Sequence, residues 1–185
     1  MLKDLVKQSR SYRSFDPAVK ITQEQLLEFA DAARLTPSTT NLQAIKFKLV
    51  SDPAHVESLV AAALRPLVLP PKGHHPAAFI VVCIDTAIAK NPTPFLKDVG
   101  IAAQTILLCA AEQGLGGCMV GNFQPEAIRE ALGLGEEILP SLCICLGKPD
   151  ETVVLEEMQD GKTAYYRDEA GVHHVPKRSL KEILL

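Results

Sequence analysis

Apolar residues run almost without a break through residues 98–122, and after Asp98 the next charge is Glu112. A surface helix carries a polar face, so a segment that is apolar nearly all round predicts a buried helix. With fewer than about twenty apolar residues, broken by Asp98, Gln104 and Glu112, it is too short and too polar to predict a membrane span. We expect Asp98 to serve the start of this helix as a cap or a favourable dipole charge, and Gly114 to end it.

The same periodicity predicts further elements on both sides of this stretch. Helices are expected at residues 2–8, from the capping box at 22–25 to about residue 34, at 53–64, at 125–132 ending at Gly133 or Gly135, and after a second capping box at 179–182. Strands are expected at 46–50, 78–85, 118–121 and 139–146, and a hairpin is expected from 163–167 and 172–175. The near-continuous β-branched run at 78–85 is typical of a strand that is buried on both faces. Residues 65–76 and 86–97 are expected to be irregular connections.

Composition places the chain among ordinary globular proteins. Its 185 residues are enough for one domain with a sizeable core, and 47% of them are hydrophobic while 22% are charged. A net charge of −3 favours neither nucleic acid nor an anionic membrane as a partner. The five cysteines lie mostly inside apolar runs, and the N-terminus has no apolar signal core. An odd number of such cysteines predicts a reducing cytoplasm.

Two groups of cations lie near the ends of the chain. Arg10, Ser11 and Arg13 form a compact set of anion donors, because arginine can grip a phosphate through two parallel N–H bonds and serine adds a short O–H donor. A solvated basic turn is the alternative. Lys177 and Arg178 follow the predicted hairpin, and taken alone they are typical of a surface pair.

Two uncharged features add to these cations. Residues 35–43 form a dense cluster of hydroxyls and amides around Pro37, which offers many hydrogen-bonding groups but is also the composition of a plain polar connection. Gly116 and Gly117 lead into a short apolar strand, a pattern that brings bare backbone up to a ligand or simply forms a tight turn. Together these features could hold a planar cofactor that carries a phosphate.

Other common kinds of site lack support in the sequence. The pairs His74–His75 and His173–His174 are adjacent in sequence and do not face the same way, and no cysteine or histidine lies at a zinc spacing, so we expect no metal. Neither the serine-hydrolase elbow nor the glycine-rich Rossmann turn is present. Cys118 is a possible nucleophile, but its apolar neighbours favour an inert core thiol.

Four motifs occur in a specific order: Arg10-Ser11-x-Arg13-x-Phe15, Pro37-Ser38-x-x-Asn41-x-Gln43, Asp98-x-Gly100-Ile101-Ala102 and Gly114-Leu115-Gly116. With this set, the chain resembles the FMN-dependent nitroreductase family over nearly its whole length. The resemblance implies one FMN-binding domain over residues 1–185 with an α+β fold, in which helices flank a mixed central sheet. It also implies an intertwined homodimer with an exchanged C-terminal segment and two FMN sites at the interface.

The resemblance also assigns residues to the flavin. Arg10, Ser11 and Arg13 would hold the phosphate and ribityl chain, joined by Lys177 or Arg178. Residues of the other subunit would approach the same flavin, namely Pro37, Ser38, Thr39 and Asn41, with Gln43 near the interface. The backbone N–H groups of Val120 and Gly121 would face flavin N5 and O4.

The function implied is hydride transfer from NADH or NADPH, through bound FMN, to an electron-poor acceptor such as a nitroaromatic or a quinone, by a ping-pong mechanism. The alternatives are a flavin-binding or sensing protein without turnover, and a specialised reductive flavoenzyme of the same family. Ala44 and Ile45 stand where the family often has Pro-Trp, and residues 66–94 are short and proline-rich where relatives often carry a longer lid. These departures leave the acceptor and the nicotinamide preference open.

Overall fold

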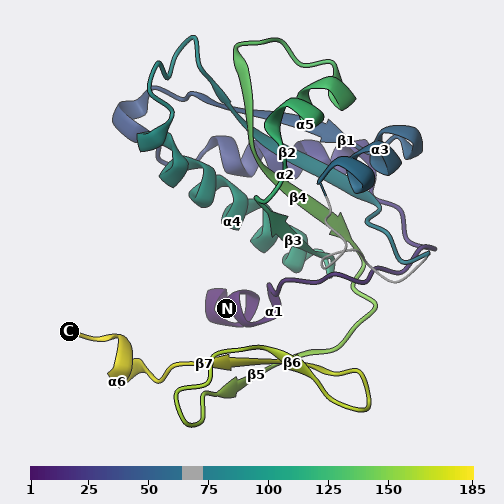
Figure 1. The fold of residues 1–185 in the computed structure, drawn as a ribbon, viewed down its shortest axis with the longest axis vertical. Coiled ribbons are helices and arrows are strands. Elements are labelled where there is room, and N and C mark those ends of the chain that lie inside the picture. Colours follow the sequence, from purple (N-terminus) through teal and green to yellow (C-terminus); the bar gives the residue numbers. More distant parts are fainter. Residues whose placement is uncertain (64–72) are drawn as a thin grey trace.

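The computed structural model describes residues 1–63 and 73–185, and a four-stranded sheet lies at its centre (Figure 1). The strands are β1 (Ile45–Val50), β2 (Ala78–Asp85), β3 (Gly116–Val120) and β4 (Ile138–Gly147), in the order β1-β2-β4-β3. Each neighbouring pair is antiparallel. β2 is buried on both faces as predicted, because its even-numbered residues 78–84 pack into one core and its odd-numbered residues 79–83 pack into another.

Helices cover both faces of this sheet. α2 (Gln23–Arg34) and α4 (Leu96–Glu112) close the first core, and α3 (Pro53–Ala63) and α5 (Pro125–Leu132) close the second. Fully buried side chains mark the contacts, with Phe29 and Ile106 in the first core and Leu59 and Ile128 in the second. The α+β class is therefore confirmed. The central sheet was predicted to be mixed, but its strand pairs are all antiparallel. Among the described residues, its one parallel contact is the bridge from Ser11 to Gly117 at the edge of β3.

α4 is the helix that the long apolar stretch predicts, but its start differs from the prediction. It begins at Leu96, after the short 3-10 turn η2 (Thr93–Phe95), so Phe95 is the N-cap and Asp98 lies inside the first turn. Asp98 can therefore act as a dipole charge but not as a cap. Gly114 follows the helix with a φ of 69° and ends it as expected.

The apolar character of α4 exceeds what its burial in this chain explains. Val99 and Ala103 are buried, whereas Leu96 and Ile101 are 55% and 42% exposed. By length and composition alone, Thr93–Glu112 is long and apolar enough to cross a membrane, which corrects the prediction that the stretch is too short and too polar. Half of an 18-residue window of this segment is buried in the protein. Packing on the sheet accounts for its buried side.

Local sequence signals set most of the other boundaries. α1 (Leu2–Gln8) matches its prediction, and the capping box of α2 is formed by Thr22 and Gln25. Gly133, with a φ of 59°, ends α5. β1, β3 and β4 each start one or two residues before the predicted position. Leu64 and residues 65–72 of the predicted connection lie outside the described residues.

The C-terminal part forms a second sheet, which lies beyond α1 in Figure 1. It contains β5 (Val153–Glu157), β6 (Tyr166–Arg167) and β7 (His173–Lys177), in the order β5-β7-β6. The predicted hairpin is confirmed as the antiparallel pair β6–β7, and the capping box at Ser179 opens α6 (Leu180–Ile183). β5 was not predicted, because its partner is β7, to which it pairs in parallel across a long stretch of chain.

Candidate cofactor site

The segment after α1 lies flat against the edge of β3. Ser11 forms the parallel bridge to Gly117, and the Tyr12 backbone N–H donates to the Gly117 carbonyl at 3.0 Å. The glycines permit this approach: a Cβ on Gly116 would lie 2.5 Å from the Tyr12 ring, and one on Gly117 would lie 2.2 Å from the Cys145 carbonyl oxygen. The two glycines therefore position the predicted phosphate-binding residues on the sheet edge.

Arg10 and Arg13 keep donors that the protein leaves unused. Arg10 Nη2 donates to the Val6 carbonyl at 2.5 Å, while its Nε is buried and has no hydrogen-bond partner among the described residues. Arg13 Nη1 donates to the Ser11 carbonyl at 3.2 Å, and its Cζ lies 5.5 Å from the centre of the Tyr165 ring. An unpaired buried guanidinium nitrogen is costly, so this arrangement suits an anionic group.

Cys118 lies beside these donors but is not an activated thiol. Burial raises the pKa of the Cys118 thiol, and the charge of Arg13 and a hydrogen bond with Ser11 offset only part of that rise. A thiol with a raised pKa carries little thiolate at neutral pH. This agrees with the interpretation of Cys118 as a core thiol.

Val120 and Gly121 lie at the far end of the same strand. Val120 is the buried last residue of β3 and pairs with Cys143, and Gly121 follows it in an exposed position. Val120 is three positions after Gly117, which corresponds to about 10 Å along a strand. The arginines and the backbone of Val120 and Gly121 therefore lie along one sheet edge, at a spacing that suits an extended ligand.

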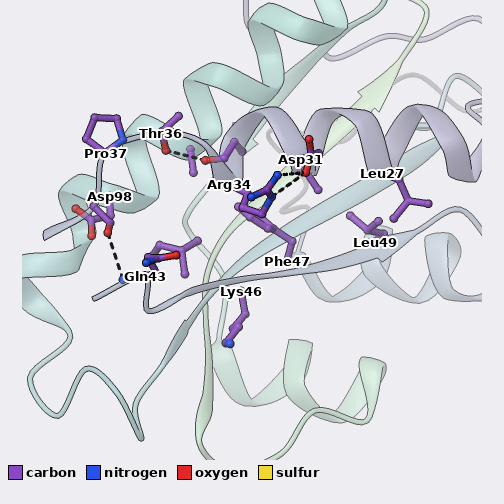
Figure 2. A pocket seen from close by; sticks show the side chains of 15 residues that line it. Leu27, Asp31, Arg34, Thr36, Pro37, Gln43, Lys46, Phe47, Leu49 and Asp98 are labelled. Atoms are coloured by element: carbon purple, nitrogen blue, oxygen red, sulfur yellow. Dashed lines mark hydrogen bonds and ion pairs between the residues drawn. The ribbon is translucent and has the colours of Figure 1, made fainter. Parts of the chain in front are cut away.

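The polar loop 37–43 belongs to a different part of the chain. It contains the 3-10 turn η1 (Thr39–Asn41), and the Ser38 hydroxyl accepts a hydrogen bond from the Gln43 backbone N–H at 3.2 Å. The loop borders a cavity of about 630 Å³ between α2 and β1 (Figure 2). Pro37, Ser38 and Gln43 line that cavity, together with apolar residues such as Phe47 and Leu49.

The two halves of the predicted site do not meet within one chain. The loop is hydrogen-bonded to Asp98 in the first turn of α4, whereas the arginine segment pairs with Gly117, which follows the end of that helix. α4 has 17 residues, which corresponds to about 25 Å. None of the predicted phosphate-binding residues lines the cavity at the loop, among those that the structure describes.

Lys177 and Arg178 lie in the C-terminal sheet and just after it. Lys177 is the last residue of β7, and Arg178 Nη1 lies 3.6 Å from Glu182 Oε1. Over residues 1–63 and 73–185, no hydrogen bond or ion pair joins either cation to Arg10, Ser11 or Arg13. Their part in the site stays a prediction.

The structure also adds residues that the sequence did not single out. The side chain of Glu151 is only 4% exposed, accepts hydrogen bonds from the backbone N–H groups of Arg13 and Ser14, and lies 2.5 Å from Arg167 Nη2. This carboxylate ties the C-terminal sheet to the arginine segment. No local motif marks it, because its partners are more than a hundred residues away in sequence or inside the hairpin.

Two adjacent histidines on β7 are expected to shift stability with pH in opposite directions. His174 Nε2 lies 3.2 Å from Asp168 Oδ2 and Nδ1 lies 3.0 Å from Glu156 Oε2, and these partners raise the pKa of His174. His173 is buried without a hydrogen-bond partner for either ring nitrogen among the described residues, and burial together with Arg167 and Arg13 lowers its pKa.

A histidine whose pKa is raised by folding contributes stability that is fully present below the pKa of the unfolded state, about 6.5. That stability is lost as the pH rises through the pKa of the folded state. His174→Gln should therefore lower the melting temperature most below about pH 6.5 and least in alkali. His173, whose pKa is lowered, has the opposite effect on stability: it destabilises the wild-type fold as the pH falls. His173→Gln should remove that loss of stability. Melting temperatures of both variants and wild type, measured below and above about pH 6.5, test these predictions. A difference between His174→Gln and wild type that does not change with pH would contradict the account.

Comparison with known proteins identifies the class. The sequence profile of the Nitroreductase family matches residues 6–78 and 72–148. A relative from Archaeoglobus fulgidus is 31% identical over 146 residues, which cover 76% of this chain and 82% of the relative. The chain belongs to the nitroreductase family.

Two further comparisons concern proteins with a stated flavin connection. The NADPH-flavin oxidoreductase of Vibrio harveyi is 31% identical over 77% of this chain and 63% of its own length. A protein of Exiguobacterium sibiricum solved in complex with FMN shares the fold with a TM-score of 0.70 and 20% identity, over 82% of this chain and 89% of its own.

Proposed function

We propose that the protein is an FMN-dependent oxidoreductase with the cofactor held on the edge of β3. The observation that carries the proposal is the row formed by Arg10, Ser11 and Arg13 beside Gly117, on the same strand edge as Val120 and the exposed Gly121. Bound FMN would supply the chemistry, which is hydride transfer from NADH or NADPH and, in a separate half-reaction, electron transfer to an electron-poor acceptor such as a nitroaromatic or a quinone.

The chain's own residues bind and orient. The guanidinium of Arg13 and the buried Nε of Arg10 would hold the phosphate through charge-assisted hydrogen bonds, with the Ser11 hydroxyl and one of Lys177 and Arg178. The backbone N–H groups of Val120 and Gly121 would hold the flavin ring at N5 and O4. Because donors to N5 favour the reduced flavin, these groups would also tune the cofactor.

We further propose that the working protein is a homodimer. The loop 37–43 and the arginine segment lie at opposite ends of α4, so Pro37, Ser38, Thr39, Asn41 and Gln43 reach a flavin only if it is the one bound by a second copy. Large apolar side chains are exposed at places that a partner would cover, in particular Leu96 and Ile101 on α4 and the C-terminal residues Leu180, Ile183, Leu184 and Leu185. An exchanged C-terminal segment would bury the latter group. A cytoplasmic location fits the five free cysteines and stays a prediction.

The purified protein is expected to be yellow, with about one non-covalent FMN per chain, and to be a dimer that buries on the order of 2,000–5,000 Å². Flavin absorbance after denaturation and light scattering measure these two properties. An NADH and NADPH oxidation assay with nitroaromatic and quinone acceptors then separates an enzyme from a flavin-binding protein without turnover. Colourless protein that does not bind added FMN, or a stable FMN-loaded monomer, would contradict the proposal.

A further inference from the structure

Asp98 is a buried carboxylate whose role is not explained by the core around it. It is 5% exposed in the first turn of α4, yet its neighbours Val99 and Ala102 are apolar core residues. Both of its oxygens are used by one residue: Oδ2 accepts from the Thr39 backbone N–H at 2.8 Å, and Oδ1 accepts from the Thr39 hydroxyl at 2.8 Å. Figure 2 shows Asp98 beside the loop that carries Pro37 and Gln43.

The loop that Asp98 holds has an unusual backbone. Thr40, Asn41 and Gln43 have φ values of 47°, 56° and 52°, and they are three of the four non-glycine residues with positive φ in the described part of the chain. Each non-glycine residue in this left-handed region costs on the order of 1–3 kcal/mol of conformational free energy, and the β-branched Thr40 is the least suited to it. Such a conformation persists only where surrounding contacts fix it.

Few contacts are available to fix this loop. Thr40, Asn41, Leu42 and Gln43 are exposed, and the bond between Gln43 N–H and Ser38 Oγ lies within the loop itself. The paired hydrogen bonds to Asp98 are therefore the main polar link between the loop and the rigid body of the protein. Because both oxygens bind the same residue, they fix the orientation of Thr39 as well as its position.

We propose that Asp98 is a positioning residue for the flavin site of the partner subunit. By holding Thr39, it keeps Thr40–Gln43 in the left-handed conformation that presents the loop to FMN bound by the other chain. This inference rests on the proposed function and on the dimer. It assigns Asp98 a role across the interface, although Asp98 itself touches no cofactor.

The effect of losing this contact follows from the population of the correct loop conformation. If only a fraction of the loops is competent, the apparent dissociation constant rises by the inverse of that fraction. Asp98→Ala removes both acceptors, so the backbone N–H and the hydroxyl of Thr39 lose their partners on α4. We expect FMN to bind about tenfold more weakly, as for a loop that is about one-tenth competent.

Mixed dimers test the proposed direction of the effect. Asp98→Ala and Arg13→Ala chains are co-expressed with different affinity tags, and the dimer that carries both tags is purified and titrated with FMN. If Asp98 serves the partner's site, one site of the mixed dimer has an intact Arg13 and an intact loop, and the other site has both defects. Half of the sites should then regain wild-type affinity, which a general loss of stability cannot produce.

Other outcomes separate the inference from the proposed function. Mixed dimers in which both sites stay weak would mean that the loop acts on its own chain. Wild-type affinity in the Asp98→Ala homodimer would mean that Asp98 positions nothing, and either result overturns the inference. Wild-type protein that does not bind FMN would overturn the proposed function itself. If Asp98→Ala does not form dimers, Thr39→Val, which removes only the hydroxyl donor, replaces it under the same criteria. Glu126→Ala, at an exposed acid in the first turn of α5, is the control and should leave the affinity unchanged.

Discussion

Replacing Arg13 by alanine is expected to weaken FMN binding by about ten- to a hundredfold. A hydrogen bond to a charged group contributes roughly 1.5–3 kcal/mol, and each ~1.4 kcal/mol changes affinity tenfold. The guanidinium makes one hydrogen bond within the described protein, to the Ser11 carbonyl at 3.2 Å, so its loss should disturb the fold little. Turnover at saturating FMN should stay near wild type, because the phosphate lies far from the reacting ring.

Fluorescence titration of the FMN-free variant measures this affinity. Arg129→Ala on α5 is the matched control, since the polar contacts of this arginine are with Glu126 and the Ile138 carbonyl, and it should leave FMN binding unchanged. Equal affinities in Arg13→Ala and wild type would mean that the phosphate is held elsewhere. Single substitutions of Lys177 and Arg178 would then be the next measurements.

Gly117→Ala is expected to destabilise the FMN-free protein by about 3 kcal/mol, at the upper end of the usual cost of overpacking. The added Cβ would lie 2.2 Å from the Cys145 carbonyl oxygen and 2.9 Å from Leu107 Cδ2. A backbone carbonyl in the middle of β4 cannot move aside as the end of a side chain can. Because Ser11 bridges to Gly117, a shift of β3 that relieves this overlap would also displace Ser11, so FMN binding should weaken together with stability.

Urea unfolding at a fixed protein concentration measures the change in free energy. Gly135→Ala is the matched control: its Cβ would also come within 2.5 Å of another atom, but that atom is the Glu137 carboxylate at the end of a flexible side chain. Gly135→Ala should therefore change stability little. Similar unfolding midpoints for Gly117→Ala and wild type would show that β3 and β4 can separate at no cost.

Local signals in the sequence were sufficient for most of the fold. The pairs Thr22–Gln25 and Ser179–Glu182 form the capping boxes that their spacing predicts, and Gly114 and Gly133 end the helices that precede them. β3 starts at Gly116, two residues before its predicted start, because pairing with Gly147 outweighs the low strand propensity of glycine. Pairing over long sequence distances also explains why β5 was missed.

The candidate site could be predicted only in part, for a related reason. Arg10, Ser11 and Arg13 were identified because their chemistry is compact in sequence, and the fold brings them to the edge that carries Val120 and Gly121. Asp98 and Glu151 act on distant backbone, on Thr39 and on Arg13 respectively, and no spacing rule reports such a contact. The resemblance implies that the site is divided between two subunits, but the positions of the two predicted halves at opposite ends of α4 are visible only in three dimensions.

The most direct test of the proposed function is a single turnover without oxygen. FMN-loaded wild-type protein is mixed in a stopped-flow instrument with NADH or NADPH, and the oxidised flavin absorbance is followed before and after addition of a nitroaromatic or a quinone. The account predicts full bleaching by at least one nicotinamide, followed by full recovery when the acceptor is added after the nicotinamide product has been removed. Bound flavin that neither nicotinamide reduces would contradict it and would leave a flavin-binding protein without turnover.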